Sequence, residues 1–141
     1  MNGKYFIDTN IFVYTFDASN IEKQNKSKEI VANALENSNG IISYQVIQEF
    51  LNVSTKKFTS PLSVADAQRY LTTILEPLCE VFSSIELYHQ ALEISERWYY
   101  SFYDSLVISA AIKADCKTIY SEDLQHSQKI QNLQIINPFI L

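Results

Sequence analysis

Short runs of β-branched and aromatic residues alternate with longer stretches of helical periodicity along the whole chain. The short runs predict strands at residues 4–7, 41–42, 78–82, 118–120 and 134–136. Apolar residues spaced three and four apart predict helices at residues 20–36, 44–58, 63–75, 85–98 and 105–114. Because parallel strands need crossover connections, this alternation favours βαβ units. The sequence therefore predicts an α/β fold with a mostly parallel central sheet and helices on both faces.

Turn-forming residues set several of these boundaries. Asn39-Gly40 is expected to close the helix over residues 20–36, since glycine is common just past a helix end. Ser63 is expected to cap the helix that follows Pro61. Pro77 is expected to stop that helix, because proline lacks the backbone N–H that a helix interior uses.

Length and composition indicate one globular domain over residues 1–141, with 47% hydrophobic and 19% charged residues. Cys79 and Cys116 have no CxxC spacing, which argues against a zinc site or a disulfide framework. Asp8 comes before a signal-peptide apolar region could form, and no later run approaches membrane-spanning length. We therefore expect a cytoplasmic protein with no membrane partner.

Four acidic residues stand where a ligand site is expected in such a fold. Asp8 and Asp123 directly follow predicted strands, and ligands of parallel sheets bind beyond the carboxyl ends of the strands. Asp104 precedes a nearly wholly apolar helix, and Glu49 lies at the margin of an apolar helical stripe. Clustered carboxylates suit Mg²⁺ or Mn²⁺. The net charge of -5 is compatible with such a cluster, although it argues against a uniform basic face.

Each acid also has an ordinary structural explanation. Asp8 and Asp104 could be helix caps, and Asp123 could be a turn or capping residue. Glu49 could be a solvated acid on a helix surface. Glu122, next to Asp123, leaves open which of the two carboxylates would contribute to a site.

Two other chemistries compete with a carboxylate site. A metal-free ribonuclease would need two histidines as acid and base, and His89 and His126 are the two that the chain offers. Their positions, on an amphipathic helix and in a polar loop, favour solvated or hydrogen-bonded side chains instead. A phosphoryl-accepting receiver or an aspartate-nucleophile phosphatase is a poorer match, since Asn10 stands where the phosphatase needs a second aspartate.

A binding module without catalysis is the remaining alternative. The aromatic cluster at residues 98–103 could stack on RNA bases, but core packing is the expectation for it. Lys56 and Lys57 are candidates for phosphate contact, although surface lysines are usually solvated. The amphipathic helix at residues 63–75 could face either a partner or the core.

Taken in order, these segments resemble the PIN-domain ribonucleases, particularly the VapC-like toxins of prokaryotic toxin–antitoxin pairs. The resemblance covers essentially the whole chain. Its most specific parts are Tyr5-Phe6-Ile7-Asp8-Thr9-Asn10, Gln48-Glu49-Phe50, Phe102 to Ala111 and Thr118 to Leu124.

The resemblance implies a three-layer α/β/α domain and a metal-dependent endoribonuclease that hydrolyses RNA phosphodiester bonds. It implies one or two Mg²⁺ or Mn²⁺ ions bound by Asp8, Glu49, Asp104 and Asp123, of which the position of Asp123 varies most in the family. Asn10 and Ser121 match positions that support the cluster through hydrogen bonds. It also implies a structured RNA substrate, an antitoxin that covers the groove, and a homodimer.

Overall fold

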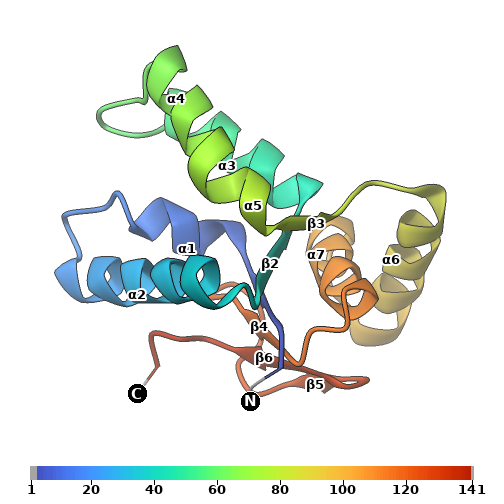
Figure 1. The fold of residues 1–141 in the computed structure, drawn as a ribbon. Helices are drawn as coiled ribbons and strands as arrows, with labels where there is room; N and C mark the ends of the chain where they lie inside the picture. Colours follow the sequence, from blue (N-terminus) through green and yellow to red (C-terminus); the bar gives the residue numbers. More distant parts are fainter. Residues whose placement is uncertain (1–2, 141) are drawn as a thin grey trace.

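A six-stranded sheet runs through the centre of the molecule in the computed structural model, which describes residues 3–140 (Figure 1). The strand order is β3-β2-β1-β4-β6-β5, and all neighbours are parallel except the β5–β6 pair. The strands are β1 Tyr5–Ile7, β2 Gly40–Ser43, β3 Cys79–Val81, β4 Thr118–Tyr120, β5 Lys129–Ile130 and β6 Leu133–Ile136. The predicted mostly parallel sheet is confirmed, while residues 1, 2 and 141 of the predicted domain lie outside the described residues.

Helices cover the sheet on two sides, as predicted for a three-layer fold (Figure 1). One side has α1 (Thr9–Tyr14) and α2 (Ile21–Asn37), and the other has α6 (Ile85–Trp98) and α7 (Phe102–Lys113). The remaining helical segments project beyond the strands, and they are α3 (Tyr44–Lys56), α4 (Val64–Tyr70), the π-helical η1 (Leu71–Leu75) and α5 (Glu76–Leu78). No helix within residues 3–140 has the length and apolar character needed to cross a membrane.

The central strands are buried on both faces, which explains their uninterrupted apolar runs. Phe6, Ile7, Ile41, Ile42 and Ile119 are at most 1% exposed. Burying each of these side chains contributes about 1.5–3 kcal/mol relative to exposure. This core fixes the carboxyl ends of β1 and β4 side by side, with Asp8 N donating to the Tyr120 carbonyl at 3.0 Å.

The helix predicted over residues 20–36 is observed as Ile21–Asn37, but the prediction that Asn39-Gly40 closes it is wrong. Ser38, with φ at 56°, closes α2, and Gly40 already belongs to β2. A Cβ atom at Gly40 would lie 2.3 Å from the Ala34 Cβ. Glycine is therefore needed at this position for the close approach of strand and helix, not for the turn.

Pro77 does not stop the helical path, contrary to the prediction. It lies within α5, directly after the π-helical turn of η1, whose last bond runs from Glu76 N to the Leu71 carbonyl. A proline ring normally clashes with the carbonyl four residues earlier. The wider π turn makes room for the ring, so the chain reaches β3 without a break.

The helix predicted at residues 105–114 begins earlier, at Phe102. Ser101 is its N-cap, and its hydroxyl accepts a hydrogen bond from Asp104 N at 3.2 Å. Asp104 therefore lies in the first turn of α7 and does not cap it. The capping explanation for Asp104 is wrong because Ser101 already occupies that position.

The aromatic cluster at residues 98–103 is divided between core and surface. Trp98, Tyr100 and Phe102 pack against the core, as predicted. Tyr99 and Tyr103 are 92% and 66% exposed, so core packing is wrong for these two residues. Tyr99 has a φ of 64° at the end of α6, which turns the chain between α6 and α7.

Candidate active site

Asp8 lies at the junction of β1 and α1, where it is the N-cap of the helix. Its carboxylate accepts hydrogen bonds from Thr9 N at 2.8 Å and from Ser121 Oγ at 2.7 Å. Burial raises the pKa of Asp8 to about 6, and the negative charges of Glu49 and Asp123 add to the effect against the two hydrogen bonds. Asp8 is therefore a cap and also one member of a group of mutually repelling carboxylates.

Glu49 extends from α3 towards the start of α1. Its two carboxylate oxygens accept hydrogen bonds from different residues, Thr9 Oγ1 at 2.6 Å and Gln45 Nε2 at 3.2 Å. Thr9 is buried, so its hydroxyl holds a fixed position between Asp8 and Glu49. The expectation of an ordinary solvated helix acid is wrong for Glu49, because it is partly buried and bonded on both oxygens.

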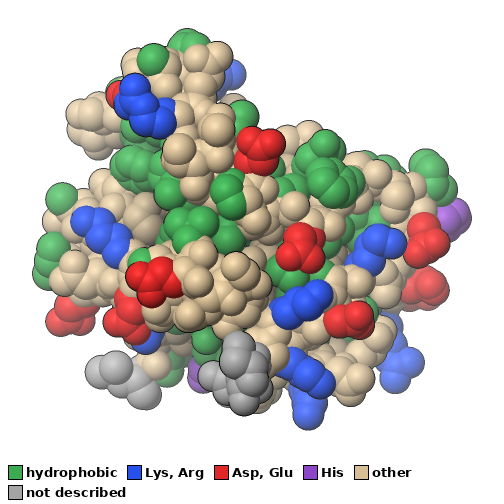
Figure 2. Space-filling view, in the orientation of Figure 1, with side chains coloured by type: hydrophobic (Ala, Val, Ile, Leu, Met, Phe, Trp, Pro, Cys, Tyr) green, Lys and Arg blue, Asp and Glu red, His purple; other side chains and the backbone are tan. Residues whose placement is uncertain are grey.

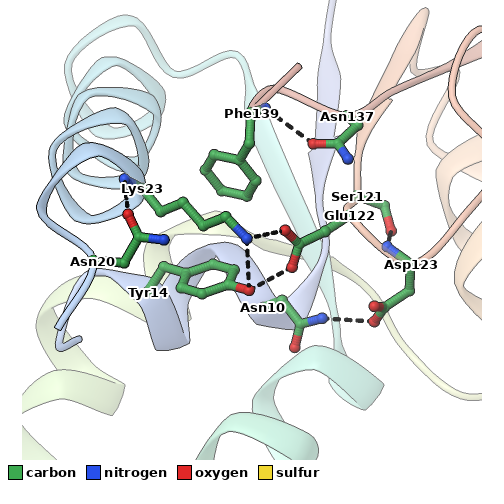
Figure 3. A network of polar contacts seen from close by, with 9 residues as sticks. All are labelled: Asn10, Tyr14, Asn20, Lys23, Ser121, Glu122, Asp123, Asn137 and Phe139. Atoms are coloured by element: carbon green, nitrogen blue, oxygen red, sulfur yellow. Dashed lines mark hydrogen bonds and ion pairs between the residues drawn. The ribbon is translucent and has the colours of Figure 1, made fainter.

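Asp123 follows β4 and is bonded to the two residues predicted to support the site. Asn10 Nδ2 donates to Asp123 Oδ2 at 2.6 Å (Figure 3). Asp123 N donates to Ser121 Oγ at 3.3 Å, and the Ser121 hydroxyl in turn donates to Asp8. Ser121 is fully buried, so it links Asp8 and Asp123 at the carboxyl edge of β4.

Glu122 points away from Asp123, towards α1 and α2 (Figure 3). Lys23 and Tyr14 both donate to its carboxylate. Burial alone would raise the pKa of Glu122, but these two hydrogen bonds outweigh it and keep that pKa below its usual range. Of the two neighbouring acids, Asp123 is therefore the one that lies near Asp8, with Ser121 as their common hydrogen-bond partner.

Asp104 approaches the same place from the first turn of α7. Burial raises its pKa, and the charges of Asp123 and Glu49 raise it further, against the lowering effect of the Ser101 hydrogen bond. The chain has thus placed carboxylates from four distant segments within electrostatic range of one another.

The four acids line one cleft of about 320 Å³, here called the acidic cleft. Other lining residues include Thr9, Asn10, Gln45 and Lys57. Three larger hollows, of about 510, 640 and 590 Å³, lie elsewhere on the described surface, and each includes a single carboxylate, Glu29, Glu76 and Glu93 respectively. The acidic cleft differs from these hollows in its number of carboxylates, not in a larger volume.

The donor set of the acidic cleft fits a hard divalent cation. Carboxylate oxygens predominate, and a bound cation would offset their mutual repulsion, which adds to the effect of burial on the pKa of Asp8. Within residues 3–140, however, no three His, Cys, Asp or Glu side chains are arranged so that they could coordinate one ion. Several of the carboxylate oxygens are instead bonded to neighbouring donors, including Thr9, Gln45 and Asn10.

Neither histidine lines the acidic cleft. His89 is exposed on α6, and His126 Nδ1 accepts a hydrogen bond from Asn137 N at 2.9 Å. These positions agree with the prediction of solvated or hydrogen-bonded histidines. Of the two candidate lysines, Lys57 lines the cleft and Lys56 does not.

Sequence reasoning assigned no role to Thr9 or Gln45. The contact between Gln45 and Glu49 could have been predicted from their spacing of four residues, which places both on the same face of α3. For Thr9, the sequence offered only its position next to Asp8. Its contact with Glu49, forty positions away, depends on how α1 and α3 meet.

Solved structures described as toxins or as toxin–antitoxin complexes share this fold. The toxin-antitoxin complex from Klebsiella pneumoniae is 15% identical, with a TM-score of 0.69 over 98% of this chain and 100% of that chain. VapC20 from Mycobacterium tuberculosis, described as a sarcin-ricin loop cleaving toxin, is 20% identical, with a TM-score of 0.61 over 85% and 90%. VapBC2 from Rickettsia felis, bound to a DNA fragment from its promoter, is 22% identical, with a TM-score of 0.58 over 93% and 96%.

The sequence comparisons give the family. No curated protein sequence matches the chain significantly. A family model described as PIN domain matches residues 5–130, which include all four acids of the acidic cleft. The resemblance stated from the sequence is thereby confirmed, and the chain belongs to the PIN domain family.

Proposed function

We propose that this protein is a Mg²⁺- or Mn²⁺-dependent endoribonuclease, and that it is the toxin of a toxin–antitoxin pair acting in the cytoplasm. The observation that carries the proposal is the convergence of Asp8, Glu49, Asp104 and Asp123 on one cleft of a PIN domain. Among the similar structures is a toxin described as cleaving the sarcin-ricin loop, and this supports RNA as the substrate class.

The acids of the cleft are the proposed metal ligands, and the supporting residues fix their orientation. A bound divalent ion would activate water and offset negative charge at the phosphate that is attacked. Thr9 and Ser121 hold Glu49 and Asp8 through their hydroxyl groups. Asn10 holds Asp123 through its amide. These donors are in place before substrate arrives, and they limit the orientations that the carboxylates can adopt.

Lys57 is the proposed phosphate contact, as the cationic residue that lines the cleft. On the face drawn in Figure 2, basic and acidic side chains are interspersed and do not form one basic surface. Binding of RNA would then depend on a few local contacts, so its salt dependence should be shallow. Lys57→Gln should weaken RNA binding and reduce that salt dependence, whereas Lys56→Gln, outside the cleft, should have little effect.

The test is cleavage of mixed cellular RNA by the purified protein with Mn²⁺, with Mg²⁺ and with EDTA. Cleavage that needs a divalent ion supports the proposal, and endonucleolytic products distinguish it from trimming at RNA ends. Cleavage that persists in EDTA would contradict metal dependence. The absence of cleavage with every metal and RNA tested would favour the alternative of a non-catalytic binding module.

The proposed partner is an antitoxin that covers the acidic cleft, since the Klebsiella and Rickettsia structures are of toxin–antitoxin type. A small open reading frame next to this one would supply the candidate. Adding its product should abolish RNA cleavage and protect the cleft from exchange of backbone amides. Light scattering on the purified chain tests the proposed homodimer separately.

A further inference from the structure

Gln45 is a buried amide in the first turn of α3, and it lines the acidic cleft. Its side-chain Nε2 donates two hydrogen bonds, one to Glu49 Oε2 at 3.2 Å and one to the Tyr103 carbonyl at 3.2 Å. Both donors of the amide group are therefore used. One bond stays within α3, and the other crosses to the first turn of α7.

This pair of bonds connects the two walls of the cleft. Glu49 lies on α3, one turn beyond Gln45, and Asp104 directly follows Tyr103 on α7. A displacement of α7 relative to α3 would stretch the bond to the Tyr103 carbonyl. The Gln45 amide thus fixes where Glu49 and Asp104 stand with respect to each other.

The side-chain oxygen of Gln45 shows that the contacts of this amide do not maximise the stability of the fold. Gln45 is 9% exposed, and its Oε1 is buried without a hydrogen-bond partner in the described structure. Turning the amide over would place Oε1 against the Glu49 carboxylate and the Tyr103 carbonyl, which is worse. A buried acceptor without a partner lowers stability, so an apolar side chain of the same size would recover part of what it loses with the two donated hydrogen bonds.

We propose that Gln45 is a positioning residue that sets the separation of Glu49 and Asp104 for binding a divalent cation. The inference rests on the proposed function, in which these two acids are ligands. It requires that replacing Gln45 weaken metal binding while leaving the fold intact. A residue with a merely structural role would show the opposite pattern, a loss of stability with metal binding unchanged.

The experiment compares Gln45→Met with Gln48→Met, a matched substitution of an exposed glutamine on the same helix outside the acidic cleft. Three quantities are measured: the melting temperature, the Mn²⁺ affinity by calorimetry without RNA, and kcat and KM for RNA cleavage. Gln45→Met should remain folded, with a melting temperature close to that of wild type, because it removes one unpaired acceptor together with two donated hydrogen bonds. Its Mn²⁺ affinity and its kcat should both fall about 10- to 100-fold, and Gln48→Met should leave all three quantities unchanged.

An isosteric variant separates the hydrogen bonds from the shape of the side chain. Gln45→Glu keeps the volume but replaces the two amide donors with a carboxylate next to Glu49. It should lose at least as much kcat as Gln45→Met at neutral pH, with a lower melting temperature because like charges stand four residues apart.

Wild-type Mn²⁺ affinity and kcat in Gln45→Met would overturn the inference. A lower melting temperature with unchanged Mn²⁺ affinity would also overturn it, since that is the structural pattern. Asp104→Asn, measured alongside, separates this failure from that of the proposed function. If Asp104→Asn is inactive while Gln45→Met is normal, only the inference about Gln45 fails, whereas full activity of Asp104→Asn overturns both.

Discussion

The first turns of α1 and α7 each direct an aspartate to the acidic cleft, but the two helices are capped differently. At α1, Asp8 is itself the N-cap and accepts a hydrogen bond from Thr9 N. At α7, Ser101 is the N-cap and Asp104 follows three residues later. At α1, one side chain both caps the helix and lines the cleft. At α7, two different side chains have these two roles. Mutations should separate the two roles at α7 and fail to separate them at α1.

The largest effect is expected at α7, from Asp104→Asn. RNA cleavage should fall about a thousandfold, because a ligand to the proposed ion is lost. The free energy of unfolding should not fall, since the Ser101 cap is untouched and since burial and neighbouring charges disfavour the ionised form of Asp104. Single-turnover cleavage and urea denaturation measure the two quantities. Asp115→Asn, an exposed aspartate beyond the other end of α7, is the control and should remain active.

Asp8→Asn should also abolish cleavage, and it should raise stability more than Asp104→Asn does, because Asp8 is the more deeply buried of the two acids. At 1.36 kcal/mol per pKa unit, raising the Asp8 pKa from 3.8 to about 6 costs the folded protein about 3 kcal/mol at neutral pH. Removing the charge should therefore raise the unfolding free energy of the metal-free protein, by at most that amount. Urea denaturation in EDTA at pH 7.5 measures it. A clear loss of stability would mean that the hydrogen bonds of the Asp8 carboxylate outweigh its burial.

The pH dependence of that difference sharpens the comparison. The folded pKa of Asp8, about 6, lies above its unfolded value, so the folded protein binds more protons between about pH 4 and pH 6. Its contribution to stability is then fully present below pH 4 and is lost as the pH rises through 6. The gain from Asp8→Asn should be about half as large at pH 5 as at pH 7.5, and near zero at pH 3.8. A stability gain from Asp8→Asn that does not change with pH would contradict the raised pKa of Asp8.

The smallest effect is expected from Ser101→Ala. Losing the N-cap of α7 should lower the unfolding free energy by about 1 kcal/mol. Cleavage by the folded fraction should stay within about twofold of wild type, because the Asp104 carboxylate itself is unchanged. A loss of cleavage comparable to that of Asp104→Asn would show that the N-cap of α7 is itself needed to place Asp104 in the cleft.

The sheet and its layers were predictable because central parallel strands are buried on both faces and leave unbroken apolar runs. Two turns were missed because a non-glycine residue there has positive φ. Ser38, at 56°, ends α2 before Gly40, and Gln131, at 55°, turns the short hairpin between β5 and β6. Neither residue type marks such a turn in a sequence. β5 itself, with two residues in a polar loop, was not predicted for the same reason.

The cleft was predictable in part. Asp8 and Asp123 follow strands, and this local fact placed both at the carboxyl edge of the sheet. The choice between Glu122 and Asp123 was not local, because it depends on where Lys23 and Tyr14 lie on α2 and α1. The role of Gln45 likewise depends on the meeting of α3 and α7, which no periodicity in the sequence encodes.

The hydrogen bond from Ser121 to Asp8 closes a span of 113 positions along the chain. A ribosome synthesises the Asp8 end before the β4 end, so the cleft remains without one of its walls until β4 has been synthesised. A nascent or prematurely terminated chain that lacks β4 would have an unpartnered β1 edge and no Asp123. Whatever reaction the cleft performs thus begins only after β4 has left the ribosome and paired with β1.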